Sequence, residues 1–293
     1  MKKIIILIPV YNDWQSVFKL LENIDKGLEV WDSDVAHISA IIFNDASTEE
    51  RPVNTFIFSS LKSIQVINMK ENKGHARCNA AGLKYISTNS EFDLVVPMDA
   101  DGEDRPKELV PLLCKAFDYP DKVITANRVK RSEGLFFKFC YLVHKYLTFV
   151  FTGQSIKFGN YTCLPKIIVS KMINEPATWS SFSGSLAKII EDRKSIPSER
   201  GTRYFGPSKM NFVKLLKHSL SIIAVFKSTL LIRSILFLIA YLFLIVGNIS
   251  IVTFIPVVAI LIMMISVIIL SRRENMKEFN SSLENIESID KIK

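Results

Sequence analysis

The strongest constraint on this chain is an apolar run near its C-terminal end that contains no charged residue. It covers residues 249–270, which are 22 residues. A helix of that length rises about 33 Å, enough to cross a hydrocarbon core of about 30 Å. A second run, residues 230–246, holds one charge, Arg233, close to its start, where the side chain can reach the membrane interface. Gly247 and Asn248 separate the runs, so the sequence predicts a transmembrane helical hairpin.

The basic residues around the hairpin predict its orientation. Lysines precede the first run and basic residues follow the second, whereas the short connector has none: Lys214, Lys217, Lys227, Arg272, Arg273, Lys277. The positive-inside rule then puts both ends in the cytoplasm. The alternative, two buried helices of a soluble core, is disfavoured because two adjacent apolar runs are hard to bury in a domain this small. We expect a multi-pass protein of the cell (inner) membrane with both termini and the preceding domain cytoplasmic.

The composition supports the same division. Hydrophobic residues make up 48% of the 293 residues, and the excess lies after residue 230, while residues 1–210 are typical of a globular domain. The net charge of +8 suits nucleic acid, an anionic membrane or phosphorylated substrates. No segment resembles a nucleic-acid-binding module, so we expect no nucleic-acid partner.

The remaining bulk features exclude other classes. The four cysteines, Cys78, Cys114, Cys140 and Cys163, form no C-x-x-C pair and no zinc-ligand spacing, which favours reduced thiols. Residues 4–8 could start a signal peptide, but the run stops at Pro9 and no small-residue cleavage site follows. A buried first strand explains it better.

Residues 1–210 alternate strand and helix patterns. Strands are predicted at 3–10, 36–43, 63–68, 94–98 and 123–126, with helices at 14–28, 73–87 and 108–117. This order predicts an α/β domain with a mostly parallel, Rossmann-like sheet, whose ligands bind beyond the carboxyl ends of the strands. Residues 211–228 are predicted to form an amphipathic juxtamembrane helix, residues 229–271 the two transmembrane helices, and residues 272–293 a disordered cytoplasmic tail. Residues 135–152 form another apolar helix with basic residues, Lys138 and Lys145, and are either interfacial or buried.

An acidic turn follows the predicted strand at 94–98. Asp99, Asp101, Glu103 and Asp104 place four carboxylates in six residues. Such carboxylates repel one another, and a bound divalent cation is the usual explanation. Hard oxygen ligands select Mg²⁺ or Mn²⁺, which would stabilise a leaving diphosphate. The alternative is a solvated acidic turn, because D-x-D alone is common.

Two weaker signals lie at neighbouring strand ends. Asp45 either accepts a hydrogen bond from a nucleobase or ribose, or forms an Asx-turn. Residues 72–77, Asn-Lys-Gly-His-Ala-Arg, open a helix with glycine and basic groups, among them Lys73. They suit either phosphate binding or a capped surface helix.

Together these pieces resemble the family-2 glycosyltransferases, which have the GT-A fold. The resemblance covers residues 1–210. It lies in Ile-Pro-Val-Tyr-Asn-Asp at 8–13, Asn-Asp-Ala-Ser at 44–47, the segment 72–82 and Asp-Ala-Asp at 99–101. Arg203-Tyr-Phe-Gly-Pro-Ser-Lys209 further resembles the R-x-x-G-x-S-K segment of the polyprenyl-phosphate subgroup, which is similar to dolichyl-phosphate mannose synthase. Gly159-Asn160-Tyr161 stands where that subgroup has a Gly-aromatic motif.

This resemblance implies roles for named residues. Asp45 would contact the nucleobase, Asp99 and Asp101 the ribose and metal, and Glu103 would be a further metal ligand. Catalytic roles are implied for Asp101, Arg203 and Lys209, and substrate contacts for Pro9, Tyr11, Asp13, Asp45, Lys73, Asp99, Arg128 and Ser208. The chain departs from the common pattern at Asn44, often Asp, and at residues 102–105, often Leu-Gln-His-Pro. The donor sugar and nucleotide therefore stay open.

The implied reaction is a metal-dependent, inverting transfer of a sugar from a nucleotide-sugar donor to a polyprenyl phosphate at the cytoplasmic membrane face. A phosphate monoester is already mostly anionic at pH 7, so it needs no general base. A rival reaction uses a glycan hydroxyl in cell-envelope polysaccharide synthesis, with Glu191 or Asp192 as base. A rival of another class is a non-catalytic, nucleotide-binding membrane scaffold. A nucleotidyltransferase is disfavoured because no glycine-rich loop follows the first strand. Self-association through the membrane helices is also open.

Overall fold

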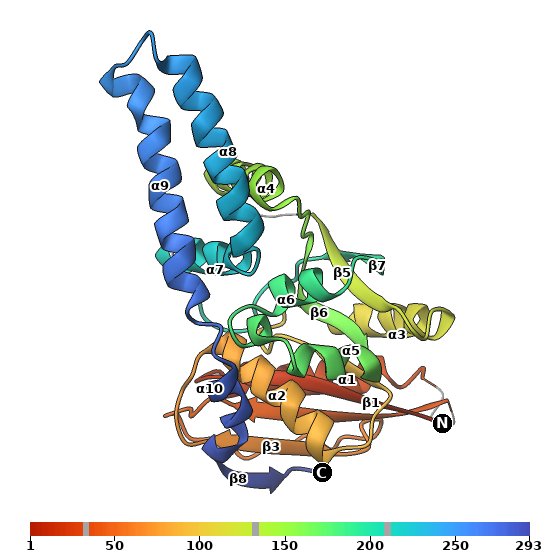
Figure 1. The fold of residues 1–293 in the computed structure, drawn as a ribbon. Coiled ribbons are helices and arrows are strands. Elements are labelled where there is room, and N and C mark those ends of the chain that lie inside the picture. Colours follow the sequence, from red (N-terminus) through yellow and green to blue (C-terminus); the bar gives the residue numbers. More distant parts are fainter. Residues whose placement is uncertain (32–34, 131–134, 208–211) are drawn as a thin grey trace.

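The computed structural model describes residues 1–31, 35–130, 135–207 and 212–293, which form a sheet domain and a projecting helical hairpin (Figure 1). The sheet has eight strands in the order β7-β5-β6-β4-β1-β2-β3-β8. Its centre is parallel: β1 (Lys2–Val10), β2 (Ala36–Asn44), β3 (Ile64–Met69) and β4 (Leu94–Pro97). Residues 4–10 of β1 are all buried, as the β-branched sequence predicts. The predicted α/β architecture is confirmed.

The other half of the sheet is mixed. Strand β6 (Phe158–Pro165) runs antiparallel to β4 and to β5 (Val123–Lys130), and β7 (Arg193–Glu199) is parallel to β5. Two antiparallel steps restore the direction, so β5 and β7 point the same way as β1. The carboxyl end of β7, Glu199, therefore lies at the same sheet edge as the carboxyl ends of β1, β2 and β4, and its start, Arg193, at the opposite edge.

Helices cover both faces of this sheet. Each face packs against its helices through a hydrophobic core. Buried residues of α1 (Trp14–Gly27) and α3 (Leu109–Asp118) belong to one core. Buried residues of α2 (His75–Asn89), α5 (Lys166–Ile173) and α6 (Phe182–Ile189) belong to the other. Short 3₁₀ turns precede α3 and α6: η1 (Pro106–Glu108) and η2 (Pro176–Trp179). Helix α2 lies so close to β1 that a Cβ at Gly82 would be 2.5 Å from a Leu7 methyl carbon. Glycine at this position therefore allows α2 to pack closely against β1, and this packing places the start of the helix at the sheet edge.

The hairpin consists of α8 (Lys227–Ile245) and α9 (Ile251–Ser271) and projects away from the sheet (Figure 1). Both helices are long and apolar enough to cross a membrane, and only 17% of the most apolar window of each is buried. Core helices of a soluble protein would be mostly buried, so this exposure favours the transmembrane hairpin. Helices α4 (Leu135–Thr152) and α7 (Phe212–Ala224) pack against it near its base.

Arg233 connects the hairpin to α4. Its Nη1 donates to the carbonyl oxygens of Val150 at 2.9 Å and Phe149 at 3.4 Å, which belong to the last turn of α4. The Phe149 carbonyl also accepts the Gly153 N–H at 2.8 Å, and the negative end of the helix dipole favours a cation at this end of α4. The only charge in the first apolar run therefore attaches α8 to the helix that leads back to β6.

The prediction of a disordered tail at residues 272–293 is wrong. This segment folds back onto the sheet domain as α10 (Met276–Asn280), η3 (Ser282–Asn285) and β8 (Ile286–Lys291), and β8 pairs antiparallel with β3. Phe279 is fully buried and stacks on Trp179 with ring centroids 5.2 Å apart. The tail is locally polar, so its sequence does not reveal a sheet partner that is 220 residues away for the pair Asn68 and Ser288.

Candidate active site

The turns after β1 and β2 are fastened to each other by Asn12, which has a left-handed φ of 50°. Its Oδ1 accepts from the backbone N–H groups of Thr48 at 2.8 Å and Glu49 at 3.2 Å, and its own N–H donates to Ser47 Oγ at 2.9 Å. Asn and Asp tolerate this conformation better than other residues. Pro9 is the last residue but one of β1 and is buried, whereas Tyr11, which directly follows the strand, is 43% exposed at the sheet edge.

Asp45 fixes the turn that begins α2. It is 4% exposed, and its two carboxylate oxygens accept from the backbone N–H groups of Lys73 at 2.9 Å and Gly74 at 2.8 Å. Burial raises the pKa of Asp45, although these two hydrogen bonds oppose the shift. The Lys73 ammonium lies 2.6 Å from Glu71. Asp45 thus positions the N-terminal end of α2, and its predicted nucleobase contact stays a prediction.

The acidic turn after β4 is folded by its own carboxylates. Asp104 is 5% exposed and accepts from the Asp99 N–H at 3.0 Å, while Asp101 Oδ1 accepts from the Glu103 N–H at 3.0 Å. Burial, and then the negative charge of Asp99, raise the pKa of Asp101 to about 6 and that of Asp104 to about 7. The carboxylates lie close enough to repel one another, and a bound cation would offset this repulsion.

Two residues that the sequence did not assign lie against Asp99. Its Oδ1 is 3.2 Å from His75 Nε2 and accepts from Asn160 Nδ2 at 3.2 Å. Burial works against the ionised form, but His75, Asn160 and Arg128 together lower the pKa of Asp99 below its ordinary value. Both missed residues lie in segments noted for other reasons, 72–77 and 159–161. Their contact depends on β6 running beside β4, which the sequence pattern does not reveal.

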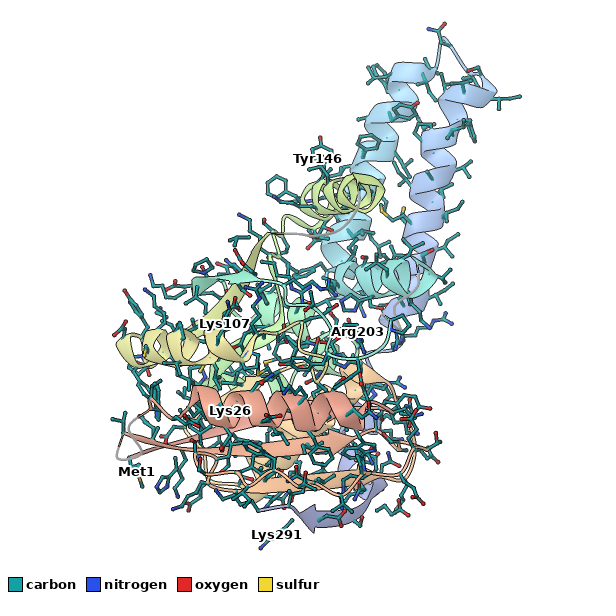
Figure 2. All side chains as sticks on the ribbon, turned by 180° about the vertical axis from the view of Figure 1, so that it is seen from behind. Met1, Lys26, Lys107, Tyr146, Arg203 and Lys291 are labelled. Carbon is teal, nitrogen blue, oxygen red and sulfur yellow. The ribbon has the colours of Figure 1, made fainter. Side chains whose placement is uncertain are left out.

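Arg203 joins this turn to the end of β1. Its Nη1 lies 2.6 Å from Asp101 Oδ2 and its Nη2 lies 2.8 Å from Asp13 Oδ2, while its buried Nε has no partner among the described residues. The next residue donates its backbone N–H to the Asp101 carbonyl at 2.9 Å. Figure 2 shows Arg203 at the side of the sheet domain that faces the hairpin. The segment after β7 therefore brings a cation to the acidic turn on the side of the domain that faces the hairpin.

Further ion pairs surround this centre. Glu103 pairs with Arg200, and Arg105 Nη1 lies 2.9 Å from Glu199 Oε2. Arg128 Nη2 is 3.9 Å from Asp104 Oδ1. A Cβ at Gly159 would lie 3.3 Å from the Arg128 guanidinium, so glycine at this position leaves room for the Arg128 side chain. Of the predicted site residues, Ser208 and Lys209 lie outside the described part of the chain.

The candidate base pair lies elsewhere. Glu191 and Asp192 are exposed and directly precede β7, at the edge opposite to the acidic turn. Asp192 Oδ2 is 2.5 Å from the Lys122 ammonium. The seven residues of β7 separate the two ends of the strand by roughly 20 Å. Neither carboxylate can reach a substrate held at Asp101 and Arg203.

The donor set suits a hard cation that is shared with a phosphate ligand. Among the described residues, no group of three His, Cys, Asp or Glu side chains is placed to hold a metal ion without help. Mg²⁺ is usually held by one or two carboxylates together with substrate phosphates and waters. The pKa values of Asp101 and Asp104 are raised because burial and the negative charge of Asp99 outweigh the effects of Arg203 and Arg128, and a bound cation would offset this repulsion. The residues therefore fit a cation that arrives with a diphosphate.

Comparisons with known proteins agree with this geometry. The model of the family described as glycosyl transferase family 2 matches residues 5–173. The undecaprenyl-phosphate 4-deoxy-4-formamido-L-arabinose transferase of Salmonella choleraesuis is 29% identical over 228 residues, which cover 73% of this chain. The match spans 64% of that relative's length.

Solved structures show the same fold. Glucosyl-3-phosphoglycerate synthase from Mycobacterium tuberculosis, in complex with Mn²⁺, UDP-glucose and phosphoglyceric acid, superimposes with a TM-score of 0.52 at 14% identity. The match covers 78% of this chain and 80% of that one. A mannosyltransferase from Pyrobaculum calidifontis, in complex with GDP-mannose and Mn²⁺, gives a TM-score of 0.51 at 14% identity. This match covers 96% of this chain and 86% of the mannosyltransferase chain.

Proposed function

This chain belongs to glycosyl transferase family 2, and on that premise we propose that it transfers a sugar from a nucleotide-sugar donor to a polyprenyl phosphate. The observation that carries the proposal is the position of Arg203. It contacts Asp101 of the acidic turn and lies on the side of the domain that faces the apolar hairpin (Figure 2). Donor diphosphate and lipid phosphate would thus meet between an acidic turn and a cation at membrane level.

The proposed acceptor agrees with the placement of the carboxylates. A phosphate monoester has a second pKa near 6 and is ionised at neutral pH, so it needs no proton removal before attack. Its oxygen attacks the anomeric carbon, and the bond from that carbon to the donor diphosphate breaks, leaving the electron pair on the nucleoside diphosphate. A single displacement of this kind inverts the anomeric configuration. The exposed pair Glu191 and Asp192, at the opposite edge, speaks against the rival reaction with a hydroxyl acceptor.

We propose that basic residues of this chain orient the phosphates and that acidic residues contact the metal ion. Arg203 and Arg128, with Lys209 as a further prediction, would orient the two phosphates, and Asp13 and Asp101 hold Arg203 in place before substrate arrives. Asp99, Asp101 and Glu103 are the proposed metal contacts. When bound, Mg²⁺ or Mn²⁺ would stabilise negative charge on the leaving diphosphate.

The location follows from the hairpin. We propose that α8 and α9 cross the cell (inner) membrane and that the sheet domain and both termini are cytoplasmic, because basic residues flank the hairpin on the domain side. Helices α4 and α7 would lie at the interface. Tyr146 on α4 is 67% exposed and projects outward from the helix (Figure 2), as an interfacial aromatic residue does.

A donor screen tests the proposal. The purified full chain is incubated with undecaprenyl phosphate, Mg²⁺ or Mn²⁺, and radiolabelled UDP- and GDP-sugars, and lipid-extractable label is counted. We expect one donor to give a lipid-linked product that Asp101→Ala abolishes. Nucleotide binding without any product would instead support the non-catalytic scaffold.

A further inference from the structure

Three side chains from different elements meet at the sheet edge. His75 is the first residue of α2, Asp99 lies just after β4, and Asn160 belongs to β6. His75 Nε2 lies 3.2 Å from Asp99 Oδ1 and 2.7 Å from Asn160 Nδ2, and Asn160 Nδ2 lies 3.2 Å from the same Asp99 oxygen. Neighbouring ligands of an octahedral ion, each about 2.1 Å from it, are about 3 Å apart. The three groups therefore have the mutual spacing of ligands around one metal ion.

Each of the three groups can supply a lone pair. The Asp99 carboxylate does so when it is ionised, and the His75 ring does so at Nε2 when it is neutral. Rotation of the Asn160 amide brings Oδ1 to the position of Nδ2, because the two ends of an amide have nearly the same size. Two acceptors that face each other, as Nε2 and the Asp99 oxygen do, are stabilised by a positive centre between them. A metal ion can take the place of a proton there.

The group is held in place by its backbone and is open to solvent. Both carboxylate oxygens of Asp45 accept backbone N–H groups directly before His75, which fixes the start of α2. The antiparallel pairing of β4 with β6 brings Asn160 beside Asp99. The side chains of His75 and Asp99 are 51% and 32% exposed, so an ion from solution can reach them.

The other carboxylates proposed as metal contacts are already paired with arginines. Asp101 Oδ2 lies 2.6 Å from Arg203, and Glu103 pairs with Arg200. Within the described part of the chain, no arginine or lysine forms an ion pair with the Asp99 carboxylate. An arriving cation therefore has less to displace at Asp99 than at the two paired carboxylates.

We propose that His75, Asp99 and Asn160 bind the metal ion of the donor complex, and that the His75 nitrogen makes the site select Mn²⁺ over Mg²⁺. This inference rests on the proposed function, and it adds two ligands from outside the acidic turn. Mg²⁺ is held by oxygen ligands, whereas histidine is a common ligand of transition-metal ions. A site made of oxygen ligands alone would discriminate less between the two ions.

Metal titrations of the full chain in detergent, with UDP or GDP present, test the proposal. Free Mn²⁺ is measured by electron paramagnetic resonance, and Mg²⁺ is measured by competition with Mn²⁺. The variants are His75→Ala, Asn160→Ala and, as a matched control, His37→Ala, which removes a histidine near the start of β2, at the sheet edge opposite to Asp99.

The two ions should respond differently to the loss of His75. Loss of a group that merely supports a metal ligand costs about 10–100-fold in affinity. We therefore expect His75→Ala to raise the Kd of Mn²⁺ at least about tenfold and the Kd of Mg²⁺ less than about threefold. Asn160→Ala should raise both Kd values, because an amide oxygen suits either ion, and His37→Ala should change neither. A histidine that only holds Asp99 in place would affect both ions equally.

A spectroscopic measurement detects the ligand directly. Pulsed electron paramagnetic resonance of wild-type protein that contains ¹⁵N-labelled histidine should show ¹⁵N coupled to bound Mn²⁺, a signal that nucleotide nitrogens cannot produce. His75→Ala should abolish the coupling, and His37→Ala should preserve it. The wild-type measurement needs no variant, so it remains decisive even if His75→Ala lowers the thermal midpoint.

The outcomes separate this inference from the proposed function. If wild-type protein binds Mn²⁺ without ¹⁵N coupling, or if His75→Ala weakens Mn²⁺ and Mg²⁺ equally, the inference is wrong and the transferase proposal stands. The inference is also wrong if Asn160→Ala leaves both Kd values unchanged. If wild-type protein binds neither ion with either nucleotide, the metal-dependent donor complex of the proposed function is itself contradicted.

Discussion

The Nη1 atom of Arg203 lies 2.6 Å from Oδ2 of Asp101, and this contact joins the segment after β7 to the acidic turn after β4. The second arm of the same guanidinium is on Asp13, so a single side chain connects three loops at the sheet edge. Arginine can do this because its planar fork presents donors in two directions. A cation thus already balances Asp101 before substrate arrives.

Replacing Arg203 should stop turnover. Arg203→Ala removes both contacts and the charge that would orient the phosphates, and we expect kcat to fall about 100-fold or more. Arg203→Lys keeps a charge but cannot bridge two carboxylates, so its kcat should be intermediate. Steady-state assays of lipid-linked product measure both. An unchanged kcat in Arg203→Ala would remove this residue from the proposed mechanism.

Metal binding should depend on pH because the pKa values of Asp101 and Asp104 are raised to about 6 and 7. The metal-free folded state then binds more protons than the unfolded chain, so its stability should fall as pH rises from about 4 to about 7. A metal ion must displace these protons, and its stabilising effect should grow over the same interval. The shift in thermal midpoint on adding Mn²⁺ should be larger at pH 7.5 than at pH 5.5. Equal shifts at both pH values, or an equal shift in Asp101→Asn, would contradict this.

Asp192→Asn should leave transfer to a polyprenyl phosphate unchanged within about twofold. The residue is exposed and pairs with Lys122 at the edge opposite to the acidic turn, and surface substitutions of this kind have small effects. Product formation by the variant and by Glu191→Gln checks the expectation. A loss of activity in either would revive the mechanism with a general base and a hydroxyl acceptor.

The ordered tail should contribute to stability. Phe279 is fully buried against Trp179, and truncation of a buried Phe costs about 3–5 kcal/mol. Phe279→Ala should therefore lower the thermal midpoint by about 6 °C or more. Ile289→Ala is the control, because Ile289 is in β8 of the same tail but 51% exposed. Equal midpoints for Phe279→Ala and wild type would mean that the tail is not docked.

Local patterns predicted much of this structure. The buried run at 4–10 marked β1, the uncharged run at 249–270 marked α9, and the polar clusters after three strands marked one sheet edge. Patterns of this kind depend only on residues that are close together in the sequence, so they can be recognised without knowledge of the fold. The family resemblance also directed attention to Arg203, and the structure places it on Asp101.

Contacts between distant segments could not be predicted in the same way. Nothing in the polar tail indicates that Ile286 pairs with Met69, because the partner strand is far away in the sequence and β8 is short. His75 and Asn160 meet at Asp99 only because β6 runs antiparallel beside β4. The role of Arg233 in holding the last turn of α4 likewise depends on how two helices pack.

The most direct test of the proposed reaction compares two acceptors that differ only in the phosphate. Purified full chain, the preferred radiolabelled nucleotide sugar and Mn²⁺ are incubated with undecaprenyl phosphate or with undecaprenol, and lipid-linked label is measured. We expect product from the phosphate, with an anomeric configuration opposite to that of the donor, and none above background from the alcohol. Equal transfer to undecaprenol, or no transfer to undecaprenyl phosphate from any UDP- or GDP-sugar, would contradict the proposed reaction.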